Sequence, residues 1–244
     1  MTFCIGIRVR DGLVALADTQ IVRGEEVSSK AKLSVHRHGD RPFFLMTSGL
    51  RSIRDKAVAR LDDELEAVDP PMARLYRLAT ALGDQLKRVR AEDGPSLESS
   101  GMRFNLHAVV GGHLSGDQAP ALFMVYPEGN WVEATADSPY FVIGRTSYGK
   151  PILDRLLTYD TPLYQAVALA YLAFDATRAS VVDVEFPIDT VVLPTGAGRF
   201  SARRFDADDL AVAHTFWHER LQAALADFPI EWAAPLWREP EEAP

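Results

Sequence analysis

The order in which hydrophobic patterns follow one another along the chain is the feature that most limits its fold. Apolar runs typical of β-strands come in consecutive blocks, and segments with helical periodicity come mostly in pairs. Blocks of strands favour antiparallel sheets, and paired helices favour separate layers that cover those sheets. We therefore predict an α+β fold, a four-layer αββα sandwich in which both sheets are buried on both faces.

The predicted elements run in the order four strands, two helices, about four strands, two helices, one strand and one helix. Two hairpins open the chain, the first joining FCIGIRV to LVALADT and the second joining KLSVHRH to PFFLMTS. Helices follow over about 53–65 and 75–89, and residues 93–103 are predicted as a polar loop. The remaining strands are FNLHAVVGG, PALFMVY, WVEAT, YFVIG and DTVVLPT, and the remaining helices lie over 149–158, 162–178 and DADDLAVAHTFWHERLQAALADF. We predict a single domain over 1–238 and a polar tail over 239–244.

The composition argues against several classes of partner. The formal net charge of −8 weighs against nonspecific binding to nucleic acid or to anionic membranes. A single cysteine, together with the lack of a long apolar run or a secretory leader, leads us to expect a cytoplasmic protein that spans no membrane. No pattern in the sequence requires a cofactor or a metal.

Threonine follows directly after the initial methionine, and the first predicted strand begins at once. A threonine hydroxyl is a poor nucleophile without a base, and removal of Met1 would give Thr2 a base in its own α-amine. The pKa of that amine, normally about 7.7–8.0, is lowered by a nearby cation, and a buried cation needs a carboxylate partner. Asp18, at the end of the second strand, and Lys32, at the start of the third, are the candidates for this pair.

The register of the first hairpin decides whether Asp18 can reach Thr2. A two-residue loop at Asp11-Gly12 would place Asp18 opposite Ile5, and a loop that also includes the preceding arginine would place it opposite Cys4. Only the second register gives Asp18 the same face as Thr2, since side chains alternate along a strand. We favour the second register, because the first buries a lone carboxylate among apolar side chains.

Two further positions complete the predicted site. Gly49 closes the TSG that ends the fourth strand, where a glycine lets the backbone approach a substrate and offers an N–H to a developing oxyanion. Lys30 remains an alternative to Lys32, because a slip of two residues would exchange them.

Several segments resemble a known family. MTFCIG, DGLVALADT, KL and LMTSGL are similar to the proteasome β-subunits and HslV-type peptidases, which are N-terminal-nucleophile hydrolases with an αββα fold. FVIGRTSYGKPILDRLLTYDTPL and DATRASVVDVEFPIDTVVL resemble the smaller bacterial branch called Anbu, the ancestral β-subunit. The resemblance extends to about residue 195. It implies a threonine-type peptidase that acts on peptides or unfolded polypeptides and assembles into a ring or helical homo-oligomer.

The resemblance also implies roles for the site residues. It makes Thr2 the nucleophile, Asp18 and Lys32 the charged pair beside it, and Gly49 the oxyanion donor. The chain departs from the proteasome pattern at Gln20, which stands where that pattern has arginine. Two alternatives stay open: an oligomeric peptide-binding scaffold of the same fold without turnover, and an N-terminal-nucleophile amidohydrolase that acts on small amides.

Two more departures from the proteasome pattern concern residues far from the N-terminus. Arg145 stands where that pattern has serine, and the Asp-x-x-Ser of that pattern is stretched here to Asp175 and Ser180.

The sequence contains other reactive side chains. We interpret Cys4 as a small core residue and His214 with His218 as a packed or interfacial pair.

Overall fold

The computed structural model describes residues 2–23 and 26–237. These fall into two compact units, Met1–Asp206 and Ala207–Pro244. A single domain over 1–238 stays a prediction, and the polar tail expected over 239–244 lies outside the described residues. Unit 2 contains the helix α5 (Ala211–Ala226), flanked by the short 3₁₀ helices η1 (Asp208–Leu210) and η2 (Glu231–Leu236).

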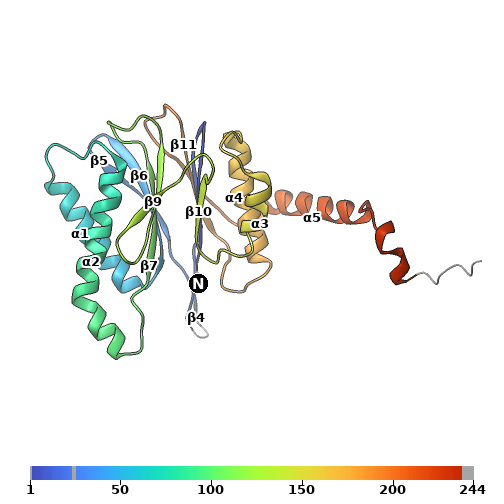
Figure 1. The fold of residues 1–244 in the computed structure, drawn as a ribbon, viewed down its shortest axis with the longest axis horizontal. Coiled ribbons are helices and arrows are strands. Elements are labelled where there is room, and N and C mark those ends of the chain that lie inside the picture. The colour runs from blue at the N-terminus through green and yellow to red at the C-terminus, as the bar shows by residue number, and fades with distance from the viewer. Residues whose placement is uncertain (1, 24–25, 238–244) are drawn as a thin grey trace, which may run out of the picture. The chain divides into compact units, whose positions relative to one another are not determined.

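Unit 1 is a four-layer αββα sandwich, as predicted (Figure 1). Its first sheet has the strand order β10–β1–β2–β11–β12 and its second has the order β5–β6–β7–β8–β9, with antiparallel pairing throughout. The strands of the first sheet are β1 (Phe3–Val9), β2 (Gly12–Asp18), β10 (Tyr140–Gly144), β11 (Ile188–Pro194) and β12 (Ser201–Phe205). Those of the second are β5 (Leu33–His38), β6 (Arg41–Gly49), β7 (Leu106–Gly112), β8 (Ala121–Val125) and β9 (Trp131–Glu133). A separate two-stranded ribbon pairs β3 (Gln20–Arg23) with β4 (Glu26–Ser29).

The helices cover the two outer faces of this sandwich. The helices α1 (Arg51–Ala67) and α2 (Leu75–Ser99) pack on the second sheet, and α4 (Leu163–Arg178) packs on β1 and β2 beside α3 (Lys150–Leu156). Among the described residues, no helix has both the length and the apolar character that crossing a bilayer requires.

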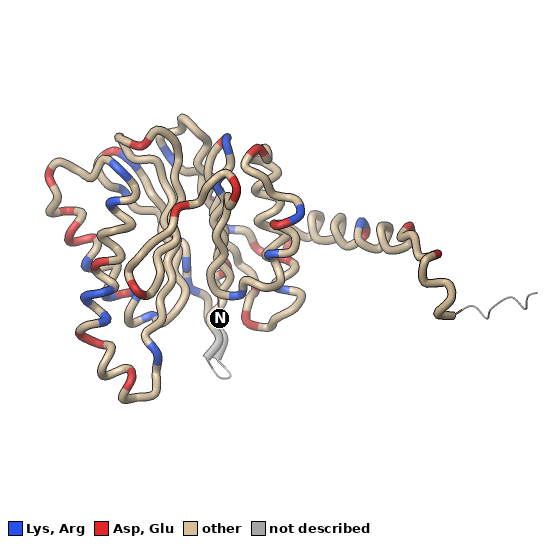
Figure 2. The backbone as a smooth tube through the Cα atoms, viewed as in Figure 1, with Lys and Arg blue, Asp and Glu red and all other residues tan. Residues whose placement is uncertain are grey.

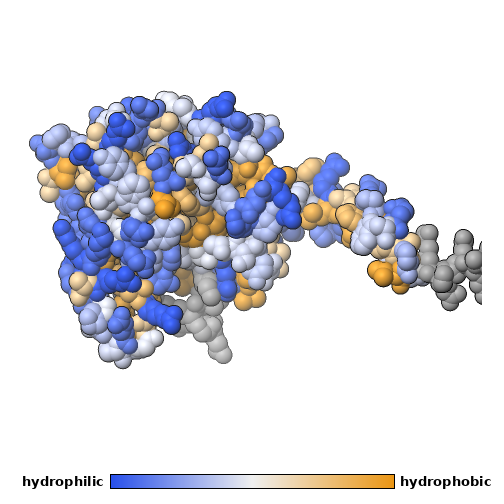
Figure 3. Space-filling view, in the orientation of Figure 1, coloured by the Kyte–Doolittle hydropathy of each residue, from blue (hydrophilic) through white to orange (hydrophobic). Residues whose placement is uncertain are grey.

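Alternation along the strands divides the core into layers. On β6, Phe43 and Leu45 face α1 and α2, whereas Phe44 and Met46 face the first sheet. Both faces are therefore apolar, which explains why the strands read as nearly continuous hydrophobic runs. Most charged residues lie on helices and loops (Figure 2), and the surface over α1 and α2 is largely hydrophilic (Figure 3).

Two segments differ from the prediction. The prediction of a polar loop over 93–103 is wrong for residues 93–99, because α2 continues through Pro95 to Ser99. Glu92 and Asp93 bind basic side chains of α1, and Leu97 packs against the core, so tertiary contacts hold these last turns in place. The ribbon of β3 and β4 and the edge strand β12 were also not predicted.

Candidate active site

The hairpin of β1 and β2 brings the predicted acid to the start of the chain, in a register that differs from both predicted ones. Cys4 pairs with Ala17, so the same register extended by one residue places Asp18 opposite Phe3. We had favoured a register with Asp18 opposite Cys4, and the alternative placed it opposite Ile5. Asp18 is therefore on the face of Phe3, and the inference that it shares a strand face with Thr2 was wrong.

Gly12 explains the difference. The turn consists of Arg10 and Asp11, and Gly12 already belongs to β2, where it pairs with β11. Its φ is +150°, and a Cβ there would overlap the carbonyl oxygen of Leu193. Gly12 is thus needed for the close approach of a strand distant in the sequence rather than for the turn itself.

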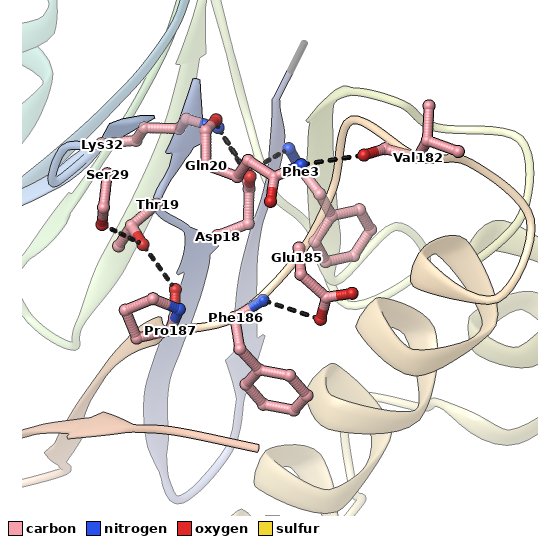
Figure 4. Close-up of polar contacts among 10 residues, drawn as sticks. All are labelled: Phe3, Asp18, Thr19, Gln20, Ser29, Lys32, Val182, Glu185, Phe186 and Pro187. Atoms are coloured by element: carbon pink, nitrogen blue, oxygen red, sulfur yellow. Dashed lines mark hydrogen bonds and ion pairs between the residues drawn. The ribbon is translucent and has the colours of Figure 1, made fainter. Parts of the chain in front are cut away.

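Asp18 nevertheless reaches the first residues of the chain, and its carboxylate is bound from two sides (Figure 4). Its Oδ1 accepts a hydrogen bond of 2.7 Å from the backbone N–H of Phe3. The ammonium of Lys32 donates to Oδ1 at 2.8 Å and to Oδ2 at 2.7 Å, and it also donates to the carbonyl oxygen of Gln20 at 2.6 Å. From the sequence we argued against burying Asp18 as a lone carboxylate. Asp18 is fully buried, but these partners bind its charge, so the carboxylate is not isolated.

The surroundings shift the pKa values of two buried acids in this corner, Asp18 and Cys4. Burial raises the pKa of the Asp18 carboxyl, and the Lys32 ammonium acts in the opposite direction. Burial also raises the pKa of the Cys4 thiol far above its usual range, and the charge of Asp18 adds to this effect. Cys4 is fully buried between the sheets and stays neutral, which confirms the prediction that it is a core residue.

The peptide that joins Thr2 to Phe3 is held at both of its polar groups. Its N–H donates to Asp18, and its carbonyl oxygen accepts a hydrogen bond of 2.7 Å from the backbone N–H of Arg145. Gly144, at the end of β10, has a φ of +92°, and a Cβ there would overlap the Thr2 carbonyl oxygen. These contacts fix Thr2 in place, although a residue so close to a chain end commonly frays.

Thr2 lies on the wall of a cavity of about 430 Å³. The cavity is formed by the start of β1, by β3, by the turn from β6 to α1, by the start of β7 and by the end of β10. Its lining residues are Thr2, Ile21, Lys30, Lys32, Thr47, Ser48, Gly49, Leu50, Arg51, Arg54, Asn105, Leu106 and Gly144. The structure thus brings three of the four predicted site residues to one cavity, and the fourth, Asp18, binds one of them.

Gly49 lies where β6 turns into α1, as the TSG segment predicted. Its φ is +140°, and a Cβ there would overlap the carbonyl oxygen of Asn105. The N–H of Leu50 donates to the same carbonyl at 2.9 Å, and α1 begins at the next residue. Gly49 is exposed and lines the cavity, and its role as oxyanion donor stays a prediction.

Comparison with solved structures identifies the family. Anbu from Yersinia bercovieri is 31% identical to this chain, with a TM-score of 0.84 over 93% of this chain and 97% of that one. A Gly-1 mutant of Anbu from Hyphomicrobium sp. strain MC1 is 33% identical, with a TM-score of 0.83 over 93% and 98%. The chain belongs to the Anbu (ancestral β-subunit) family. Its fold is accordingly the N-terminal-nucleophile hydrolase fold predicted from the sequence.

A third Anbu structure, from Pseudomonas aeruginosa, was determined as a helical assembly of the Anbu complex. It is 28% identical to this chain, with a TM-score of 0.85 over 93% of this chain and 97% of that one. Comparisons with protein-family models and with curated proteins found no match.

In this Anbu-family chain the two candidate lysines occupy different positions. Lys32 binds Asp18, whereas Lys30 lines the same cavity and its ammonium has no hydrogen bond or ion pair among the described residues. Gln20, which replaces the arginine of the proteasome pattern, donates from its side chain to the carbonyl oxygen of Val182 at 2.8 Å. The geometry therefore favours Lys32 as the partner of the acid.

Arg145 has a carboxylate partner that sequence reasoning missed. Its Nη2 donates to Oδ2 of Asp183 at 3.0 Å, in the loop that connects α4 to β11. Although burial alone would raise it, the Arg145 guanidinium holds the pKa of Asp183 below its ordinary value. The signal that could have found Asp183 is the arginine itself, since an arginine next to the site needs a carboxylate.

The residues to which the Asp-x-x-Ser pattern was fitted lie elsewhere. Asp175 is on α4, 3.6 Å from Arg178, and the hydroxyl of Ser180 donates to the carbonyl oxygen of Ala176. Neither lines the cavity beside Thr2.

The histidine pair lies on α5 in unit 2. The rings of His214 and His218 are stacked, with centroids 6.5 Å apart, and Nε2 of His218 lies 3.0 Å from the side-chain nitrogen of Gln222. Within residues 2–23 and 26–237, no group of three or more His, Cys, Asp or Glu side chains could hold a metal ion.

Proposed function

We propose that this Anbu-family protein is a threonine-type N-terminal-nucleophile peptidase that cleaves peptides or unfolded polypeptides in the cytoplasm. The observation that carries the proposal is the buried Lys32–Asp18 ion pair, which is joined to the N–H of Phe3 directly beside Thr2. A buried ion pair is weak support for stability, because desolvation offsets much of the attraction between its charges. The location of this ion pair at the cavity that Thr2 lines supports a catalytic role instead.

In the proposed reaction, removal of Met1 frees the α-amine of Thr2. The Thr2 hydroxyl oxygen attacks the peptide carbonyl carbon while the amine takes the hydroxyl proton. The N–H of Gly49 stabilises the oxyanion, and the positive charge of Lys32 favours the unprotonated amine. Collapse of the intermediate breaks the C–N bond, and the leaving amine takes the proton from the Thr2 ammonium. Water, deprotonated by the same amine, then hydrolyses the acyl ester and restores Thr2.

The experiment that tests this function has two steps. Intact-protein mass spectrometry first establishes whether Met1 has been removed, and a panel of fluorogenic peptides then measures hydrolysis by the full chain. We expect loss of one methionine residue and hydrolysis that Thr2→Ala abolishes. Equal hydrolysis by the wild type and the Thr2→Ala variant would reject Thr2 as the nucleophile.

A second candidate function is an oligomeric peptide-binding scaffold without turnover. It is favoured by the departures from the proteasome pattern, since Arg145 replaces a serine and binds Asp183, and Gln20 binds a backbone carbonyl. Retained Met1, together with peptide binding without cleavage, would support the scaffold. Hydrolysis of small acyl amides but not of peptides would instead support the third candidate, a small-amide amidohydrolase.

We also propose that the chain assembles into a homo-oligomer. The Pseudomonas aeruginosa relative forms a helical assembly, and unit 2 of this chain exposes large hydrophobic side chains (Figure 3). These are Val212, Phe216, Leu221, Leu225, Phe228, Ile230, Trp232, Leu236 and Trp237. Exposed apolar side chains in such number are typical of an interaction surface. We expect sedimentation velocity to show a large species in the wild type and a smaller one in Leu225→Glu, and electron microscopy would distinguish a ring from a helix.

A further inference from the structure

The cavity beside Thr2 has a charge opposite to that of the whole chain. Among the described residues, four cationic ones line it, namely Lys30, Lys32, Arg51 and Arg54, and no aspartate or glutamate does. The chain as a whole has a formal net charge of −8. The cavity is therefore a local site of positive charge on an acidic protein.

Two carboxylates near the cavity neutralise only part of this charge. Asp18 binds Lys32, and Asp55 accepts hydrogen bonds from Arg51 at 3.2 Å and from Arg54 at 2.8 Å. Counted over the residues that the structure describes, four cations against two carboxylates leave two positive charges at the cavity. One of them belongs to Lys30, whose half-buried side chain binds no carboxylate in the described part of the chain.

The start of α1 adds to the positive potential. The helix has 17 residues, no side chain caps its N-terminus at Leu50, and no acidic residue lies in its first turn. A helix N-terminus carries a partial positive charge, so Arg51 and Arg54 have the unfavourable sign there. A helix N-terminus without a side-chain cap, with two arginine side chains beside it at a cavity, is suited to bind an anion supplied from outside the chain.

The rest of the lining matches a particular kind of anion. The lining includes the polar residues Thr47, Ser48 and Asn105. Ile21 and Leu50 add aliphatic surface. A short aliphatic stem that ends in a carboxylate would contact both kinds of surface, and this describes the side chains of glutamate and aspartate.

We propose that this basic cavity binds the carboxylate of an acidic substrate side chain, so that Thr2 attacks the carbonyl of a Glu or Asp residue in preference to others. Lys30 and Arg54 are the residues that determine this specificity. Lys30 binds no carboxylate among the described residues, and Arg54 shares the one carboxylate of Asp55 with Arg51, whereas Lys32 binds both oxygens of Asp18. The inference rests on the proposed peptidase function and names its substrate class.

The test uses the full chain carrying Thr2→Ala, so that binding is measured without turnover. Two labelled peptides with amidated C-termini differ only in one residue, Glu or Gln, and their binding is followed by fluorescence anisotropy. We expect the Glu peptide to bind at least about tenfold more tightly at low salt, because charge-assisted hydrogen bonds are stronger than neutral ones. We expect the difference to shrink in high salt, which screens partly exposed charges. A Gln peptide with a free C-terminus shows whether a chain-terminal carboxylate can take the same place.

The variants locate the effect. Adding Lys30→Gln and Arg54→Gln together should reduce the preference for the Glu peptide to about twofold or less. Lys87→Gln, which removes one positive charge from the surface of α2, is the matched control and should leave the preference unchanged. Equal binding of the two amidated peptides, or an undiminished preference in the double variant, would overturn the inference.

The two proposals fail in different ways. Wild-type protein that hydrolyses Gln and Glu peptides equally well would reject acidic specificity and leave the peptidase function intact. Absence of hydrolysis of every peptide, together with a preference for the Glu peptide that depends on Lys30 and Arg54, would reject the peptidase function and retain the carboxylate site.

Discussion

Two groups of ion pairs in this molecule have the same chemistry in opposite surroundings. The Lys32–Asp18 pair is almost entirely buried, with side chains 9% and 0% exposed. The pairs of Lys56 and Arg60 with Glu92 join α1 to α2 at the surface, with side chains 33–46% exposed. Water and salt screen the surface pairs, whereas the buried pair has lost its hydration and depends on its few partners.

The pKa values of the two carboxyls show the difference. Burial raises the pKa of Asp18 despite the bound ammonium, whereas hydrogen bonds from Arg60 and then Lys56 lower the pKa of Glu92 to about 2. The surface network thus favours the charged state of its acid, and the buried site holds a charged state at a cost. We interpret the surface pairs as support for the last turns of α2 and the buried pair as part of the proposed chemistry.

The largest expected effect is on activity. Thr2→Ala removes the proposed nucleophile and should lower kcat/KM for peptide hydrolysis by roughly 10³-fold or more. Thr2→Ser keeps a hydroxyl and is the matched control, so it should retain measurable hydrolysis. Steady-state hydrolysis of one fluorogenic peptide by all three proteins measures this, and a Thr2→Ser variant as inactive as Thr2→Ala would count against a hydroxyl nucleophile.

The next effect is on stability and concerns the buried pair. Lys32→Met leaves the Asp18 carboxylate buried without its cation, which should lower the free energy of unfolding by about 3–5 kcal/mol at pH 7. Lys30→Met, in the same cavity but without an ion pair to any described residue, should cost much less. Urea denaturation followed by circular dichroism measures both variants.

The pH dependence of Lys32→Met sharpens the comparison. The folded-state pKa of Asp18 is raised, and it rises further when Lys32 is removed. The free energy of unfolding therefore decreases as the pH rises through that pKa, because the buried carboxyl becomes charged. The destabilisation by Lys32→Met should therefore be smaller at pH 4 than at pH 7. A destabilisation that does not change with pH would mean that Asp18 is not the group left unpaired.

A smaller effect is expected at Gly144, which lies against the Thr2 carbonyl. Gly144→Ala combines a φ of +92° with overlap of that oxygen and should lower the free energy of unfolding by about 1–3 kcal/mol. Gly196 has a φ of +82° with no atom within 4 Å of the position of a Cβ, so Gly196→Ala isolates the strain of the backbone. Equal losses in the two variants, measured by thermal unfolding, would show that the contact with Thr2 adds nothing.

The smallest effect is expected in the surface network. Glu92→Gln should change the free energy of unfolding at pH 7 by an amount close to the error of the measurement, because exposed pairs contribute little. With its folded pKa lowered to about 2, Glu92 contributes stability above its ordinary value of 4.5 that is lost as the pH falls toward 2. Any stabilisation by Glu92 that is measurable at pH 7 should therefore decrease over this range. A difference that grows in acid would contradict the assigned direction of the shift.

The fold was predictable because its core elements carry strong periodicity. Phe43 and Leu45 alternate along β6 with Phe44 and Met46, which is the spacing of a strand with two buried faces. The apolar residues of α1, α2 and α4 recur at helical spacing. The edge strand β12 carries no such signal, since Arg203 and Arg204 are exposed and the strand exists through its pairing with β11.

The site was predictable in its residue types and less so in its geometry. Asp18, Lys32 and Gly49 lie close to Thr2, as expected. The register of the first hairpin depends instead on the contact of Gly12 with β11, which is about 180 residues away in the sequence, and no local pattern indicates that contact. Asp183 escaped prediction for a related reason, because it lies in a loop without periodicity.

The most direct test of the central claim is to locate the adduct of a peptide epoxyketone. This probe offers one electrophilic carbon to a hydroxyl and a second to an amine, so it reports on both groups of a free N-terminal threonine. We expect peptide mass spectrometry of the full chain to find one adduct, on Thr2, that is lost in Thr2→Ala and reduced in Lys32→Met under conditions where that variant is folded. An adduct on another residue, or unchanged labelling of Thr2→Ala, would contradict the account.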